Sequence, residues 1–297
     1  DRLHETAFQG SDLGRTILGS TENISKISRE QLVEYINTHY TPDRIVLVGS
    51  GGVDHAELCK LAEKNFGHLQ APKNHLSEPS MVYDPSVFVG SDIRERDDYM
   101  PEAHVAIAVQ GAEWTHPAAF SLMVGQCLLG FWDKNSGSGA KVSSPLCRRA
   151  AEENLAHSIM AFNTCYSDTG LFGVYATAPE KTLDDLVSLV QTEMVHLVDD
   201  QNDAEMDRAK SLLKAHLFAS MSGTTAATED IGRQLLSYGR HMSTAEICFR
   251  IDQVTSQDVQ AAAEHFIWDK EVAVASMGPL KAMPELNFMR RRTYFLR

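Results

Sequence analysis

Apolar side chains recur at intervals of three and four residues over two stretches, residues 183–197 and 206–221. This spacing collects them on one face of an α-helix, so both stretches predict amphipathic helices. Thr182 with Asp185 three residues later is a typical helix start. A more uniformly apolar run, residues 117–129, predicts a helix with little exposed surface.

Shorter apolar runs bounded by turn residues predict strands. Residues 157–166 and 170–178 are joined by Ser-Asp-Thr, which is turn chemistry that closes an antiparallel pair. Two further strands are expected at about 93–97 and 104–109, and a further helix near 145–154. Strands and helices that alternate irregularly in this way indicate an α+β fold.

Residues 27–52 and 254–279 repeat one pattern. Ser28 opens a helix in the first and Thr255 in the second, each with a Gln or Asp three residues later, which is typical of a capping box. Each helix ends in His followed by an aromatic residue. The chain then turns at Asp followed by Arg or Lys, and continues into a strand rich in β-branched residues that ends at glycine. A repeat of such long period predicts a duplicated domain. Chance resemblance between two helix-turn-strand units is the alternative.

The repeat divides the chain into three parts. Residues 1–70 form the end of the first copy, 71–92 a Pro-rich linker, and 93–297 the second copy. By the same spacing, the first copy would begin about 130 residues ahead of Asp1. We therefore expect two similar α/β-sandwich halves, each an antiparallel sheet with helices on one face, with the first half truncated at its N-terminus.

The composition argues against several classes of function. A net charge of −13 argues against a nucleic-acid partner, because phosphates have to be neutralised by Lys and Arg, and it suits a basic partner or substrate. The longest nearly apolar run, residues 118–132, is too short to cross about 30 Å of hydrocarbon, so no transmembrane segment is expected. The five cysteines are widely spaced and odd in number, which is typical of unpaired, buried thiols in a reducing compartment.

Twelve histidines raise the question of a metal site. A zinc site on one helix needs His at i and i+4, or a His-x-x-Glu-His run, and no two histidines here lie that close. The first ten residues read as a helix, on which the adjacent His4 and Glu5 point about 100° apart and cannot chelate one ion. We assign no metal ligand to these residues.

Three other candidate motifs are better explained by structural roles than by catalysis. The glycines of residues 135–141 do not have phosphate-loop spacing, so a flexible loop is expected. Ser143, Ser144 and Ser167 have no nucleophile-elbow context. The C-terminal sequence MRRRTYFLR could clamp an anion, but an arm that docks through its last aromatic and apolar residues, with the arginines in water, is the stronger expectation.

Tyr166 and Asp168 flank the turn between the two paired strands. The tyrosine could close the edge of the sheet. Alternatively, its phenol could point into a cleft between the two copies and donate a hydrogen bond to a developing oxyanion.

Four segments in order carry a family resemblance: LGRTILGSTENI, FNTCYSDTGLFGVY, TEDIGRQLLSYGR and MGPLKAMPELNFMRRRTYFLR. They resemble the M16-type zinc peptidase family, in particular mitochondrial processing peptidase β subunits and the related core I proteins of the cytochrome bc1 complex. The resemblance covers essentially the whole chain, and it is closest to the plant and algal form, in which one protein has both roles.

The resemblance implies two α+β halves around a cleft, with a zinc-binding His-x-x-Glu-His helix and a later Glu ligand in the first half. Those positions would lie ahead of Asp1, so zinc is expected as the cofactor but no ligand or general base falls within this sequence. Asp1 matches a substrate-binding aspartate that takes an arginine near the presequence cleavage site, where animal core I proteins tend to have Asn. Tyr166 matches a tyrosine that approaches the scissile carbonyl. Residues 135–141 are at best a reduced counterpart of the α subunit's glycine-rich loop.

Two functions follow from the resemblance. The first is a zinc metalloendopeptidase subunit that trims basic presequence peptides from imported preproteins with an α subunit, in the mitochondrial matrix. The second is a proteolytically inactive core I subunit, which contacts core II and other complex III subunits on the matrix face of the inner membrane. In the plant-type arrangement both hold. An unrelated α+β binding protein is the third alternative.

Overall fold

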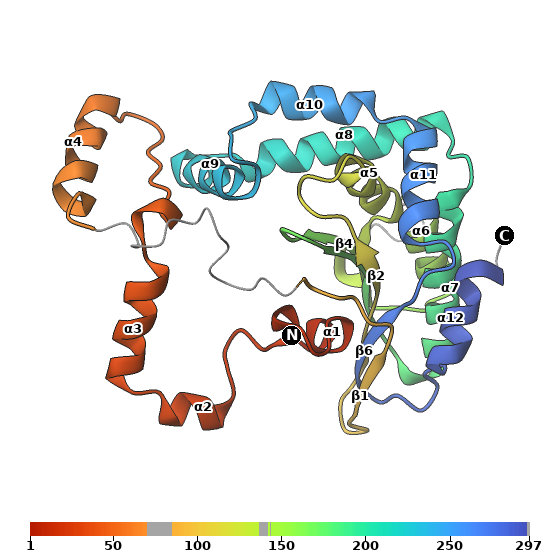
Figure 1. Ribbon diagram of the computed structural model, residues 1–297. Helices are drawn as coiled ribbons and strands as arrows, with labels where there is room; N and C mark the ends of the chain where they lie inside the picture. The colour runs from red at the N-terminus through yellow and green to blue at the C-terminus, as the bar shows by residue number, and fades with distance from the viewer. Residues whose placement is uncertain (70–84, 137–141, 143, 296–297) are drawn as a thin grey trace. The chain divides into compact units, whose positions relative to one another are not determined.

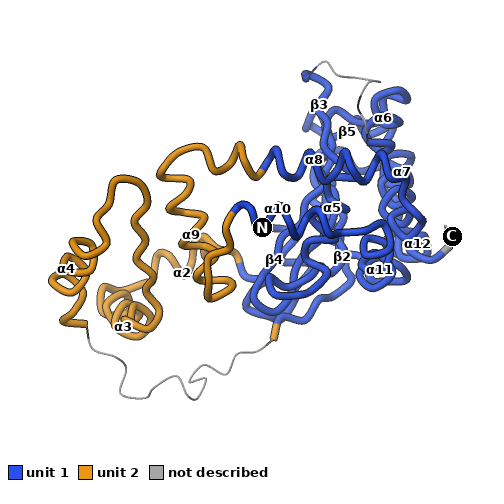
Figure 2. Tube along the Cα trace, turned by 90° about the horizontal axis from the view of Figure 1, so that it is seen from above, with its two compact units in different colours: residues 1–15, 86–216, 244–297 blue, residues 16–85, 217–243 orange. Residues whose placement is uncertain are grey.

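The computed structural model describes residues 1–69, 85–136, 142 and 144–295. Most of the predicted linker (residues 70–84), most of the 135–141 loop, Ser143 and Leu296 lie outside the described residues. The chain forms two compact units (Figure 2). Unit 1 consists of Asp1–Arg15, Ser86–His216 and Thr244–Arg297, and unit 2 of Thr16–Pro85 and Leu217–Ser243. The predicted division at residues 70 and 93 stays a prediction.

Unit 1 is built on a six-stranded sheet with the strand order β1-β6-β2-β5-β4-β3 (Figure 1). The strands are β1 (Asp92–Arg96), β2 (Ala103–Gly111), β3 (Phe131–Asp133), β4 (Ser158–Cys165), β5 (Gly170–Ala178) and β6 (Ala273–Gly278). The turn predicted between residues 166 and 170 joins β4 and β5 as an antiparallel pair, which confirms that prediction. The short strand β3 was not predicted.

The prediction of an antiparallel sheet is wrong at one edge. β1 pairs with β6 in parallel, from Asp92 opposite Val274 to Arg96 opposite Gly278, so the sheet is mixed. A tight turn can join only antiparallel neighbours, whereas a parallel pair needs a long crossover connection. Here nearly the whole of unit 1 forms that connection, which the local pattern of either strand does not reveal.

Helices cover one face of this sheet. α5 (Ala119–Leu129), α7 (Leu183–Val195) and α11 (Ser256–Phe266) pack against strands β4, β5 and β2, respectively. Every second strand residue points to this face, and Ile107, Phe172 and Val174 are almost fully buried there. Unit 1 also contains α6 (Pro145–Glu152), α8 (Asp203–Ser220), which continues into unit 2, α10 (Thr244–Gln253) and α12 (Leu286–Phe295).

One helix lies on the opposite face of the sheet, so the expectation of helices on one face only is also wrong. α1 (Arg2–Ala7) is followed by Phe8, and Ala7 and Phe8 are both fully buried. They form a small apolar cluster with Ala108, Leu171 and Ala273, three residues of neighbouring strands. This cluster fixes the first residues of the chain over the middle of the sheet.

Unit 2 consists of α2 (Thr21–Lys26), α3 (Arg29–His39), α4 (His55–Phe66) and α9 (Thr224–Tyr238). Both predicted capping boxes are confirmed, at Ser28 in α3 and at Thr255 in α11. The strand predicted after α3 does not form, and residues 45–50 are irregular. Its counterpart β6 has a neighbour on each side. No strand runs beside residues 45–50 in the described part of the chain, so their backbone groups have no ladder to join.

Unit 2 exposes much of its apolar surface. On α3 alone, Leu32, Tyr35 and Ile36 are each more than half exposed. Contiguous apolar surface of this kind is rare on monomeric proteins and marks places where another protein segment packs.

The C-terminal segment differs from the predicted arm. α12 docks through Met289, which is fully buried, and Thr293, whereas Tyr294 is 39% exposed. Its arginines are partly engaged, because Arg290 forms ion pairs with Asp269 and Glu271 at 3.0 and 2.8 Å. A helical period of four places Met289 and Thr293 on one face, whereas the predicted arm was expected to dock through its last aromatic and apolar residues.

The cysteines are free, and they differ in reactivity. Cys127, Cys147 and Cys165 are buried, and burial raises the pKa of each thiol to about 11. Cys59 is exposed, so the expectation of buried thiols is wrong there.

This contrast predicts selective labelling. A thiol of pKa about 11 is almost wholly protonated at pH 8 and is also shielded by burial, whereas Cys59 is exposed. A maleimide should therefore modify Cys59 long before the three buried cysteines. Mass spectrometry of the labelled peptides measures the order. Equal rates at Cys59 and Cys147 in the folded protein would contradict it, and denaturant should remove the difference.

Candidate functional site

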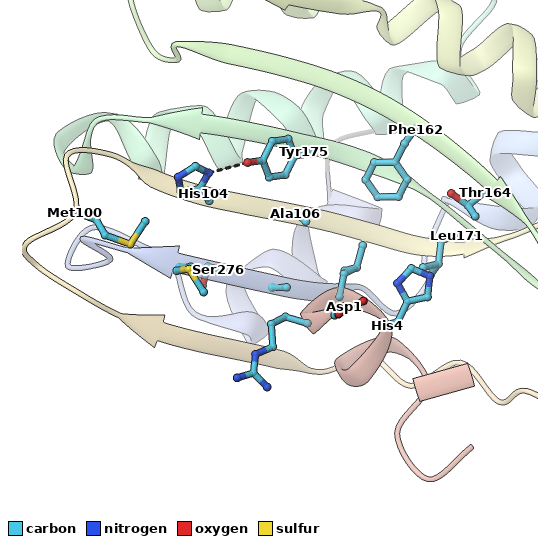
Figure 3. A pocket seen from close by; sticks show the side chains of 14 residues that line it. Asp1, His4, Met100, His104, Ala106, Phe162, Thr164, Leu171, Tyr175 and Ser276 are labelled. Atoms are coloured by element: carbon cyan, nitrogen blue, oxygen red, sulfur yellow. Dashed lines mark hydrogen bonds between the residues drawn. The ribbon is translucent and has the colours of Figure 1, made fainter. Parts of the chain in front are cut away.

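A cavity of about 540 Å³ lies on the face of the sheet that carries α1 (Figure 3). Most of its lining is apolar, and side chains from α1 and from four adjacent strands enclose it. Alternate residues of β2, β4 and β5 supply this lining, because side chains point to the two faces in turn, and β6 adds the consecutive residues 275–277. Its main residues are Asp1, Leu3, His4, Met100, His104, Ala106, Phe162, Thr164, Leu171, Tyr175, Ala275 and Met277.

Asp1 lies at the rim of this cavity, just ahead of α1. It is exposed, and its carboxylate does not cap the helix. Its neighbour Arg2 is instead paired with Glu5 at 2.7 Å and with Glu95, and these carboxylates raise the pKa of Arg2. The carboxylate of Asp1 thus has no ion-pair partner among the residues that the structure describes, and it lies beside an apolar cavity where a cation could bind.

Tyr166 is held in the turn between β4 and β5. Its backbone N–H donates to the Thr169 carbonyl at 2.8 Å, and its own carbonyl accepts from the Trp114 N–H at 3.0 Å. The phenol oxygen forms a hydrogen bond with Nε2 of His4. Burial raises the pKa of the Tyr166 phenol, so the group is protonated at neutral pH and can donate a hydrogen bond.

Asp168, a further polar residue of this turn, stabilises the fold. Its carboxylate accepts a hydrogen bond from the Ser86 backbone N–H at 2.7 Å, which ties the turn to the segment before β1. Asp1 and Tyr166 therefore both lie at α1, Asp1 at its N-cap and Tyr166 through the hydrogen bond to His4. Asp168 is instead engaged in a contact that stabilises the fold.

The pairing of His4 with Tyr166 was missed by sequence reasoning. His4 was tested only as a metal ligand, and its partner is distant in the sequence. Asp1 and His4 are three residues apart at the start of a helix, a spacing that places both on one side, and that signal could have linked them. Burial is the main cause that lowers the pKa of His4, so the imidazole is neutral at pH 7.

A second polar pair lines the far part of the cavity. Nδ1 of His104 and the Tyr175 hydroxyl are 2.6 Å apart, and both side chains point toward each other in Figure 3. Glu102, just before His104, is hydrogen-bonded to His157 at 2.8 Å, and this bond lowers the pKa of Glu102. The first of these contacts connects β2 with β5, and the second connects the residue before β2 with His157, the residue before β4.

The described residues do not fit a metal centre. No cluster of three or more His, Cys, Asp or Glu side chains able to hold a metal ion occurs among residues 1–69, 85–136, 142 and 144–295. Within the same residues, no helix is long and apolar enough to cross a membrane. The apolar cavity is lined by the carboxylate of Asp1 and the neutral imidazole of His4, and the protonated phenol of Tyr166 lies one hydrogen bond beyond His4. These are groups that can bind and orient a ligand.

Comparison with known proteins agrees with this architecture. The chain is 46% identical over its full length to a probable mitochondrial processing peptidase β subunit from Arabidopsis thaliana, of which it covers 56%. It is 44% identical over 97% of its length to a mitochondrial processing peptidase β subunit from Bos taurus, of which it covers 58%. The chain thus spans little more than half the length of these relatives.

A solved structure has the same fold. A chain in the structure described as complex III2 from Candida albicans with Inz-5 bound matches with a TM-score of 0.91 and 27% sequence identity. The match covers 99% of this chain and 69% of that chain. Residues 26–213 match the family profile described as the Peptidase M16 inactive domain. The chain therefore belongs to the M16 peptidase family.

Proposed function

We propose that this chain is the β subunit of a mitochondrial processing peptidase, a zinc endopeptidase that removes presequences from imported preproteins, and that it also serves as the core I subunit of complex III. Identity of 43–46% to β subunits from plants, animals and fungi supports the proposal. The protein would act in the mitochondrial matrix, or at the matrix face of the inner membrane, with an α subunit or core II protein as its partner.

Zinc and its ligands lie, in this proposal, in a part of the protein ahead of Asp1. The described residues hold no group that fits the ion, so their contribution is to bind and orient the peptide. The two α+β halves expected from the repeat, with residues 1–70 in the first, belong to the same proposal.

The observation that carries the proposal is the free carboxylate of Asp1 at the rim of an apolar cavity. Presequences are basic and amphipathic, so they offer an arginine to the carboxylate and apolar side chains to the cavity. A charge-assisted hydrogen bond between guanidinium and carboxylate contributes about 1.5–3 kcal/mol when partly desolvated. The net charge of −13 attracts such peptides at longer range.

Tyr166 would act on the bond to be cut. As a protonated phenol it can donate a hydrogen bond to the scissile carbonyl oxygen, whose negative charge grows in the transition state. Its fixed backbone hydrogen bonds hold the turn that carries it, so this donor is positioned before the peptide arrives.

A purely structural core I subunit is the second candidate. The likeness to a chain of a complex III structure favours it.

Substitution of Asp1 tests the peptidase role. In the complete protein assembled with its α subunit, Asp1→Asn should lower kcat/KM about tenfold for a presequence peptide with arginine two residues before the cut, because the ion pair is lost. A peptide with alanine at that position should be cut equally by both proteins.

Asp12→Asn is the matched control, since Asp12 pairs only with exposed Arg15 at 3.0 Å and should leave both peptides unaffected. Equal kinetics of wild type and Asp1→Asn on the arginine peptide would refute the role of Asp1. Absence of any chelator-sensitive cleavage by the wild type would favour the structural candidate.

A further inference from the structure

The phenol of Tyr166 has one proton to donate, and its direction depends on the partner that the oxygen already has. That partner is His4, whose Nε2 is hydrogen-bonded to the Tyr166 hydroxyl. The bond joins α1 to the β4–β5 turn, two elements that the sequence separates widely. If the imidazole accepts, the phenol proton points to His4. If the imidazole donates, the phenol proton is free to point to another acceptor.

Packing holds both rings in place. His4 and Tyr166 meet edge to face, with centroids 5.8 Å apart and planes at 81°. The fully buried ring of Phe8 stands against Tyr166 in the same way, at 6.5 Å and 89°. Edge-to-face contacts of this kind favour one relative orientation of the rings. His4 also lines the cavity, so the hydroxyl lies within one hydrogen bond of the proposed peptide site.

The surroundings of His4 favour an uncharged ring. Burial lowers the pKa of His4. The other charged side chains of α1 and its N-cap are Asp1, Arg2 and Glu5, and Glu5 compensates Arg2 together with Glu95. From the β4–β5 turn come Tyr166 and Asp168, and the latter is bound to the Ser86 N–H. A neutral imidazole has one donor and one acceptor nitrogen, and the hydrogen bond of one nitrogen sets the state of the other.

The geometry points to His4 as a positioning residue for Tyr166. We propose that the neutral imidazole carries its proton on Nε2 and donates it to the phenol oxygen, so that the phenol proton is directed away from His4 toward a bound peptide. Nδ1 has no partner among the described residues that would demand the other tautomer, and it can accept from water. The tautomer of His4 does not depend on the proposed function, whereas the expected effect of His4 on cleavage rests on it.

This arrangement strengthens the donor. A hydroxyl that accepts a hydrogen bond becomes a better donor, because successive hydrogen bonds polarise one another. Neutral His4 therefore both directs the Tyr166 proton and strengthens the hydrogen bond that Tyr166 donates to a carbonyl oxygen.

The tautomer can be measured without any cleavage assay. Nitrogen NMR of the histidine-labelled complete protein should show His4 with a protonated Nε2 and an unprotonated Nδ1 at neutral pH, with the signal assigned by its loss in His4→Gln. A His4 that is protonated on Nδ1, with Nε2 as the acceptor, would overturn the proposal, whether or not the protein proves to be a peptidase.

The effect on cleavage separates positioning from general support of the fold. His4→Leu should lower kcat about tenfold with KM changed less than twofold, because only the transition-state donor is misdirected. His4→Gln, which offers an N–H donor of similar reach, should restore most of kcat. Equal losses in both variants, or a loss confined to KM, would overturn the proposal. If His4→Leu does not fold, the tautomer measured by NMR and the kinetics of His4→Gln still test the proposal.

Discussion

Replacing Phe8 with alanine is expected to lower the free energy of unfolding by about 3–5 kcal/mol. Phe8 is fully buried, and its ring stands edge to face against Phe88 and Tyr166, with centroids 6.1 and 6.5 Å away. Alanine would leave a cavity between α1 and the sheet, since the surrounding strands cannot collapse into it. Urea denaturation of the full chain, followed by tryptophan fluorescence and circular dichroism, measures the change.

The same substitution should also disturb the candidate site. α1 carries Asp1 and His4, so its release removes both from the cavity and should expose the chain near Gly10 to proteases. Tyr99→Ala is the matched control, because that aromatic side chain is entirely exposed and its loss should change stability by less than about 0.5 kcal/mol. A similar small effect for Phe8→Ala would mean that α1 contributes little to the fold.

The second large effect is expected at Gly173, in the middle of β5. A Cβ at this position would overlap the Ile107 carbonyl oxygen and lie 2.8 Å from Cα of Ala108. β5 is bonded to β2 on one side and to β4 on the other, so its backbone cannot shift without breaking a ladder. Gly173→Ala should therefore cost more than about 4 kcal/mol, or prevent folding altogether.

Soluble yield, circular dichroism and the denaturation midpoint measure this outcome. Gly125→Ala in α5 is the control, because the nearest atoms to its added Cβ would be side-chain atoms at 3.7 and 3.8 Å, which is ordinary contact. Alanine inside a helix is favoured over glycine by up to about 1 kcal/mol, so this variant should be at least as stable as the wild type. Equal stability of the two variants would show that β2 and β5 can separate locally.

Local patterns were sufficient for most elements of unit 1. The three- and four-residue spacing over residues 183–197 and 206–221 predicted α7 and α8, and the turn after Cys165 predicted the β4–β5 pair. These elements are determined by neighbours in the sequence, because a helix face and a tight turn are both short-range features.

Features that depend on distant residues were not predictable in this way. The parallel pairing of β1 with β6, and the position of α1 on the second face of the sheet, arise from contacts between segments far apart in the chain. Residues 45–50 have the composition of a strand, yet a strand exists only where another one supplies hydrogen bonds. For the candidate site, the resemblance suggested Asp1 and Tyr166 one by one, whereas their connection through His4 required the fold.

The pairing of β1 with β6 also bears on how the protein is made. Asp92 meets Val274, so a chain that emerges from the ribosome from its N-terminus exposes β1 until residues near 274 have arrived. Contacts of such long sequence separation form slowly, and unpaired strand edges promote aggregation in the meantime. This family member is therefore expected to depend on chaperones during its synthesis.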